Sequence, residues 1–269
     1  MEYSVEYRKD KEAHSSGVSW SAVIAGAFVM AALVLILLAL GAGLGLSSVS
    51  PWSNVGASAS TIGTASIIWL IVLEVLSSSM GGYLAGRLRT KWANIHNDEV
   101  YFRDTAHGFL AWATALVITA AFLATAATVM VGSTTSAASQ SKTTDAGGVS
   151  TYFTDALFRA DGSRPETAST AVRSEAAAIF ATSLAAGAMT PADQSYLDQV
   201  VSAKTGLAPA DADRRVTGVF ADAQKAAETT RKAVAHALLW TFLALLIGAF
   251  CASFAATIGG RQRDNVVVL

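Results

Sequence analysis

The chain has 269 residues, of which 52% are hydrophobic and only 14% charged, whereas a soluble domain usually carries about 25% charged residues. The net charge of −1 gives no basic surface, so we expect no nucleic-acid partner. The single cysteine, Cys251, excludes an intrachain disulfide and a cysteine-rich zinc motif, and no residue pattern requires a cofactor.

Four apolar windows are long enough to cross a membrane, because a helix spans the hydrocarbon with roughly 20 residues. They comprise residues 20–46, 62–85, 108–132 and 234–258. A backbone in lipid must satisfy its own hydrogen bonds, so each window is expected to be helical. The first is longer than the apolar core of a cleaved signal peptide and is interpreted as a signal anchor. The sequence therefore predicts an all-α polytopic membrane protein with four transmembrane helices.

The distribution of Lys and Arg predicts the orientation of these helices. Positive residues occur in the tail 1–19, the loop 86–107 and the tail 259–269, whereas the loop 47–61 has none. We therefore expect both termini and the loop 86–107 in the cytoplasm. Residues 133–233 are then outside.

The second and fourth windows end alike, which suggests an internal repeat. Residues 79–90 and 253–264 each contain Gly-Arg-x-Arg after a small-residue-rich stretch. One interpretation is a pair of helical hairpins related by an approximate two-fold axis along the membrane normal. The alternative is convergence, since every helix leaving the inner leaflet favours small residues followed by arginine.

Glu74, near the middle of the second window, is the sharpest candidate for a functional site. A charged carboxylate there costs several kcal/mol, so Glu74 is expected to be protonated or paired. Ser78, Gly81 and Gly82 share its face of the helix, and Gly82 and Gly86 form a small-xxx-small pair that permits close helix packing. A proton or cation site and a structural, hydrogen-bonded Glu both remain open.

A second cluster of ionisable residues precedes the third window. His, Asp and Glu side chains could bind a divalent metal, and the candidates here are His96, Asp98, Glu99 and His107. The alternative is an ordinary helix start, with acidic residues in its first turn and a Glu99–Arg103 pair at i, i+4.

The external segment begins with a Ser/Thr/Gly-rich stretch, residues 133–149, which has the composition of a flexible linker. The remainder, 150–233, is expected to form a small helical domain. One helix is expected over 165–188, another from Pro191, and a last one from near Pro209 that could continue into the fourth window. The segment has no His and no Cys, which argues against an enzyme.

Several stretches carry a resemblance over essentially the whole chain. They read SWSAVIAGAF (19–28), SPW (50–52), DEVYFRDTAHGFLAW (98–112), KTGLAPADADRRV (204–216) and IGGRQRD (258–264). The chain resembles a group of alphaproteobacterial four-helix membrane proteins often labelled "PhnA-like". The resemblance implies a bacterial inner membrane, with residues 133–233 in the periplasm, and it implies no catalytic residues.

The sequence thus favours a non-enzymatic accessory, scaffold or assembly subunit that uses its periplasmic domain for interaction. Its expected partners are the lipid bilayer and either a second copy or other membrane subunits. The alternative is a small proton- or cation-linked channel or transporter with Glu74 and Ser78 at the intramembrane site.

Overall fold

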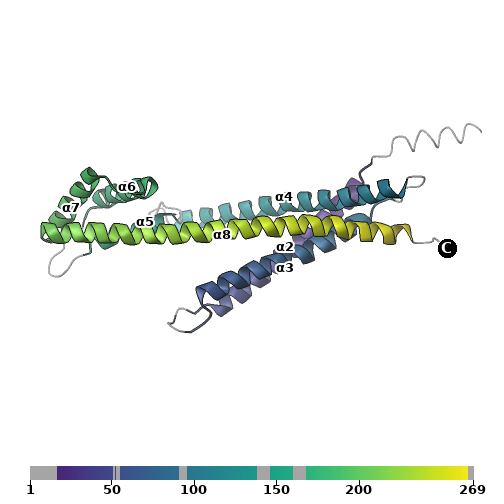
Figure 1. Cartoon of the computed structure of the whole chain (residues 1–269), viewed down its shortest axis with the longest axis horizontal. Helices are drawn as coiled ribbons and strands as arrows, with labels where there is room; N and C mark the ends of the chain where they lie inside the picture. Colours follow the sequence, from purple (N-terminus) through teal and green to yellow (C-terminus); the bar gives the residue numbers. More distant parts are fainter. Residues whose placement is uncertain are drawn as a thin grey trace, which may run out of the picture. The chain divides into compact units, whose positions relative to one another are not determined.

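The computed structural model describes residues 17–50, 52, 55–90, 96–137, 146–159 and 168–265, and every regular element in these ranges is a helix (Figure 1). The helices are α2 (Trp20–Ser48), α3 (Ala59–Arg87), α4 (Asn97–Ala137), α5 (Ala146–Leu157), α6 (Thr170–Ala186), α7 (Pro191–Thr205) and α8 (Pro209–Asp264). The contacts divide the chain into two units, residues Met1–Val131 with Ala237–Leu269, and residues Gly132–His236. We call them the first and the second unit.

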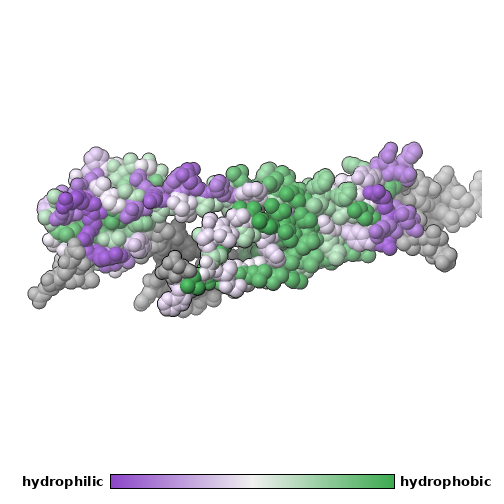
Figure 2. Space-filling model, turned by 60° about the horizontal axis from the view of Figure 1, so that its bottom comes forward, coloured by the Kyte–Doolittle hydropathy of each residue, from purple (hydrophilic) through white to green (hydrophobic). Residues whose placement is uncertain are grey.

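Four helices are long and apolar enough to cross a membrane, namely α2, α3, α4 and α8. Each contains one of the four windows expected from the sequence, so the prediction of an all-helical protein with four candidate spans is confirmed. Figure 2 shows the apolar side chains of these helices as a green band on the face in view.

In the first unit, α2 and α3 run antiparallel and close together (Figure 1). Gly26 lies against Gly81 and Ala85 at one end of the pair, and Gly41 lies against Trp69 nearer the other. A Cβ on Gly26 would lie 2.5 Å from the carbonyl oxygen of Gly81, so only glycine permits this approach. Small residues bring the two backbones together where lipid offers no hydrophobic driving force between helices.

Helix α8 packs in the same way against both α3 and α4. A Cβ on Gly82 or Gly86 would lie 2.2 or 2.0 Å from a carbonyl oxygen of α8, that of Ala252 or Ala256. Gly108 of α4 also meets Ala252. The last part of α8 is therefore held between the two helices by backbone contact.

The second unit has a core of larger side chains. Phe180 of α6, Leu197 of α7, and Val216 and Phe220 of α8 are buried together with Leu157 of α5. Its helices have ordinary caps: Thr190 accepts a hydrogen bond from the Asp193 amide at 3.1 Å, and α6 and α7 end at glycines in the left-handed conformation.

Several predicted boundaries need correction. Within the linker expected over 133–149, α4 continues to Ala137 and α5 begins at Ala146, and residues 138–145 lie outside the described residues. The helix expected over 165–188 begins at Thr170, where Ser169 caps it, and Pro165 lies outside the described residues. The loop expected over 86–107 includes the first turns of α4, which begins at Asn97, and residues 91–95 lie outside the described residues. Most of the tail 1–19 also lies outside the described residues.

Helix α8 is continuous. It comprises 56 residues from Pro209 to Asp264, which confirms that the helix expected from near Pro209 continues through the fourth apolar window. Gly218 lies within it without interrupting it.

Candidate functional site

Glu74 lies on the face of α3 that meets α8. Its Oε2 accepts a hydrogen bond from the hydroxyl of Ser78 at 3.2 Å, and Ser78 is fully buried. A Cβ added to Gly248 of α8 would lie 2.3 Å from the same carboxylate oxygen and 3.2 Å from the indole nitrogen of Trp112. The missing side chain at Gly248 is therefore what makes space for the Glu74 carboxyl group.

A small cavity of about 40 Å³ adjoins this carboxyl group. Its walls come from α2, α3 and α4 and consist of Met30, Val34, Glu74, Trp112, Ala115, Leu116 and Thr119. A volume of this size holds about two or three water molecules. The cavity is therefore large enough for a small hydrated guest and too small for an organic substrate.

Thr119 is the second polar group at the cavity. Its side chain is buried, and its hydroxyl oxygen has no hydrogen-bond partner. A buried hydroxyl without a partner is destabilising by about 1–3 kcal/mol. Glu74 and Thr119 thus face one cavity from different helices, in surroundings that are otherwise mainly apolar.

The structure places Gly81, Gly82 and Gly86, the three glycines expected to pack against other helices, at helix contacts. Gly81 meets α2, whereas Gly82 and Gly86 meet α8. Glu74 and Ser78 therefore lie on a helix that is fixed on two sides. This packing defines the position of the carboxyl group.

A buried ion-pair network lies where α3 and α8 end and α4 begins. The Arg89 guanidinium donates to both carboxylate oxygens of Asp104, and its Nη2 also donates to Oδ2 of Asp264 at 2.8 Å. The side chain of Arg89 is 0% exposed and that of Asp104 3% exposed. One arginine thus connects the ends of three helices.

Asp104 and Asp264 stabilise the positive charge of Arg89. Burial by itself lowers the pKa of the guanidinium, but the hydrogen bonds and charges of Asp104 and Asp264 outweigh this effect and raise the pKa. In the sequence, Arg89 is part of the orientation signal and of the Gly-Arg-x-Arg repeat, and neither pattern predicts the network. The available signal was an acidic residue, Asp104 or Asp264, near the polar end of a helix that also contains an apolar window.

His107 has a structural role at the same end of the first unit. Its Nε2 accepts the backbone N–H of Ser19 at 2.8 Å, and its Nδ1 lies 2.6 Å from the carbonyl oxygen of Arg103. An amide N–H can only donate, so Nε2 carries no proton and Nδ1 donates to the carbonyl. His107 of α4 is therefore neutral and fixes the residue that precedes α2.

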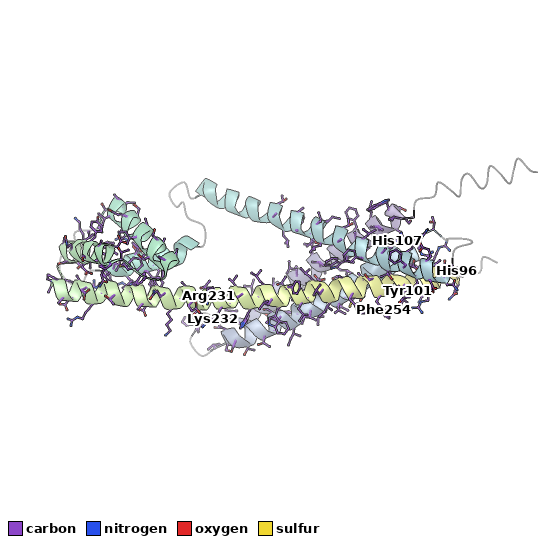
Figure 3. The ribbon with its side chains drawn as sticks, turned by 45° about the horizontal axis from the view of Figure 1, so that its top comes forward. His96, Tyr101, His107, Arg231, Lys232 and Phe254 are labelled. Atoms are coloured by element: carbon purple, nitrogen blue, oxygen red, sulfur yellow. The ribbon has the colours of Figure 1, made fainter. Side chains whose placement is uncertain are left out.

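The four metal candidates are not brought together. Figure 3 shows His96 at the start of α4 and His107 farther along the same helix. Glu99 pairs with Arg103 at 2.7 Å. Among the described residues, no group of three or more His, Cys, Asp or Glu side chains is arranged to hold a metal ion. The Glu99–Arg103 pair and the acidic first turn of α4, with Asp98, agree with the alternative of an ordinary helix start.

Comparison with protein-family models, curated proteins and solved structures finds no match to the chain. The resemblance drawn from the sequence stays a prediction.

The arrangement around Glu74 has the chemistry of a binding site for a small polar guest. The cavity presents a carboxyl group and a hydroxyl group, both of which are oxygen ligands suited to protons, water and hard cations. The guanidinium of Arg89 is occupied by two carboxylates, and both ring nitrogens of His107 have partners.

Proposed function

We propose that the protein is a non-enzymatic accessory or scaffold subunit of the bacterial inner membrane, whose second unit makes protein contacts in the periplasm. The observation that carries the proposal is the continuity of α8. This one helix contributes Val216 and Phe220 to the core of the second unit, and Ala252 and Ala256 to the close contacts of the first unit. One helix thus takes part in the core of both units.

The proposed orientation puts both termini in the cytoplasm. It is supported by the arginines at the ends of α3 and α8, because cytoplasmic boundaries are enriched in Lys and Arg. The antiparallel contacts of α2 and α3 are consistent with the first of two hairpins. The second hairpin and the two-fold relation belong to the proposal.

The surface of the second unit supports an interaction role. Tyr152 of α5 is 59% exposed and Tyr196 of α7 is 40% exposed. Exposed tyrosines are enriched in protein interfaces, because their rings combine a large apolar area with a polar hydroxyl. We expect partner contacts, either with a second copy or with another membrane subunit, to include these side chains.

Site-specific crosslinking tests the proposal in native membranes. A photoreactive phenylalanine analogue replaces Tyr196 or Tyr152 in the full chain, and Tyr101 of the first unit, which is 50% exposed, serves as the matched control position. We expect a discrete crosslinked protein from positions 152 or 196, identified by mass spectrometry. A product of twice the chain mass identifies a homo-oligomer, and any other mass identifies a different subunit. If neither position yields a crosslink and gentle extraction gives only a monomer, the proposal is wrong.

Cysteine labelling tests the orientation separately. Cys251 is the only native cysteine, so Cys251→Ser gives a clean background for single replacements. Ser174→Cys in the second unit is expected to react with a membrane-impermeant maleimide applied from the periplasmic side, whereas Thr90→Cys is expected to react only after the membrane is opened. The reverse pattern would invert the orientation.

A further inference from the structure

The cavity beside Glu74 combines an ionisable group with a second polar group that lacks a partner. Thr119 is 8% exposed and lines the cavity. Its hydroxyl makes no hydrogen bond, although threonines in helices commonly donate to the carbonyl four residues earlier. A guest that accepts or donates a hydrogen bond would satisfy this oxygen. The second polar group therefore points to a bound species and not to Glu74 alone.

The shape of the site is maintained around the carboxyl group. Gly248 leaves the space that Oε2 of Glu74 occupies. Ser78, one turn farther along α3, donates a hydrogen bond to the same oxygen. Trp112 borders the same space with its indole N–H donor. The carboxyl group therefore has defined neighbours on α3, α4 and α8.

The charge of the site limits what it can bind. Glu74 is the only Asp, Glu, Lys or Arg in the four apolar windows, 20–46, 62–85, 108–132 and 234–258. One positive charge neutralises its carboxylate, whereas a divalent ion would leave a net positive charge among apolar side chains, which is strongly unfavourable. A guest of single positive charge and of the size of one ion with one or two waters fits both the charge and the volume of about 40 Å³.

We propose that the cavity between Glu74 and Thr119 binds a monovalent cation, either a proton or an alkali-metal ion. Glu74 provides the charge, and Thr119 provides an oxygen ligand directly or through water. The proposal is independent of the scaffold function, since it concerns only the first unit. It would hold whether or not the second unit binds a partner.

Infrared difference spectroscopy on the full chain in lipid bilayers tests the proposal. The protein film is perfused with acidic and then alkaline buffer, and at constant pH with sodium, potassium or choline chloride. Loss of the carbonyl band of a protonated carboxyl group, in a spectrum that Glu74→Gln abolishes, is expected. Loss upon alkalinisation alone assigns a proton, and loss caused by sodium or potassium but not by choline assigns an alkali-metal ion.

Two further variants make the test specific. Thr119→Val keeps the shape of the side chain and removes the oxygen, so the midpoint of the transition should shift by about tenfold in ion or proton concentration. Glu99→Gln removes an exposed carboxylate that pairs with Arg103 and should leave the Glu74 band unchanged. The amide band in the same spectra reports whether each variant keeps its helices.

Two results would contradict the proposed cation site. A Glu74-dependent band that neither pH, sodium nor potassium changes would mean that Glu74 is a permanently protonated structural residue beside a water-filled cavity. The absence of any Glu74-dependent change, in the protonated-carboxyl region and in the carboxylate stretching region alike, would mean a carboxylate that takes up no cation under these conditions. Either result overturns the proposal, and neither affects the scaffold function.

Discussion

The two units of the chain are packed by opposite rules. In the first unit the buried positions are mostly small, such as Ala27, Gly82, Ala115 and Ala252, whereas large side chains such as Phe250, 72% exposed, point outward. In the second unit the large side chains are inside, with Phe180 and Phe220 in edge-to-face contact at 5.6 Å between ring centroids.

The difference reflects the solvent that each unit is built for. Water drives large apolar side chains into the interior of a domain. Lipid does not distinguish an outward from an inward Phe, so helices there associate through close backbone contact and polar interactions. The following variants test this contrast, beginning with the largest expected effect.

Arg89→Gln should destabilise the first unit most. The substitution leaves Asp104 buried without its cation, and breaking a buried ion pair from one side costs about 3–5 kcal/mol. Equilibrium unfolding in mixed micelles measures the loss. The exposed Arg261→Gln is the matched control and should cost little.

An Arg89→Met, Asp104→Leu double variant sharpens this result, because apolar replacement of both members of a buried pair is often close to neutral. Recovery of stability in the double variant would attribute the loss to an uncompensated charge. If Arg89→Gln were as stable as the original chain, the network would not hold the three helix ends together.

Phe180→Ala should destabilise the second unit by about 3 kcal/mol, because it leaves a cavity among Leu197, Val216 and Phe220. Phe250→Ala, the same substitution in the first unit, should have little effect, since that ring faces outward. Hydrogen exchange followed by mass spectrometry measures both changes in one experiment. Equal losses at the two positions would contradict the contrast between the units.

The membrane spans and the helix starts could be predicted from the sequence because their signals are local. Uncharged windows of sufficient length identify α2, α3, α4 and α8, and Thr190-Pro191 identifies the start of α7. The start of α4 also had a local signal, because the acidic first turn and the Glu99–Arg103 pair indicate a helix start ahead of the apolar window. Helix formation does not require apolar residues, and the polar turns from Asn97 onward continue the same helix.

Only part of the candidate site could be predicted from the sequence. Glu74 is visible in the sequence because a carboxylate in an apolar window is unusual. Its companions Thr119, Trp112 and Gly248 are ordinary residues of apolar helices, and only the packing of three helices brings them to one place. The same reason concealed the contact of Arg89 with Asp264, which are 175 residues apart.

Gly86→Ala should cost about 1–3 kcal/mol, because the new Cβ would lie 2.0 Å from the carbonyl oxygen of Ala256 and α8 would have to move. Gly63→Ala in the same helix has open space around it and should be neutral or slightly stabilising. Unfolding in mixed micelles again provides the comparison. A loss at Gly63 equal to that at Gly86 would show that helix propensity, and not close packing, controls the first unit.

The smallest expected effect lies in the second unit and depends on pH. Burial of Asp198 on α7, and then the nearby charge of Asp213 on α8, raise the pKa of Asp198, and its Oδ1 is buried without a hydrogen-bond partner. The folded unit therefore keeps a proton on Asp198 at a pH where the unfolded chain has lost it. Stability from this group is full below the unfolded pKa of about 3.8 and decreases as the pH rises through the folded value.

Asp198→Asn removes this dependence without changing the shape of the side chain. At neutral pH the variant should be more stable than the original chain by less than about 1 kcal/mol, since the carboxyl group is only partly buried and water screens its charge. The advantage should disappear as the pH falls toward 4. Hydrogen exchange of α7, corrected for intrinsic rates, measures both quantities, and Asp193→Asn at the start of the same helix serves as the control. A stability gain that is the same at every pH would show that the amide acts by a new hydrogen bond, and not by relieving the repulsion from Asp213.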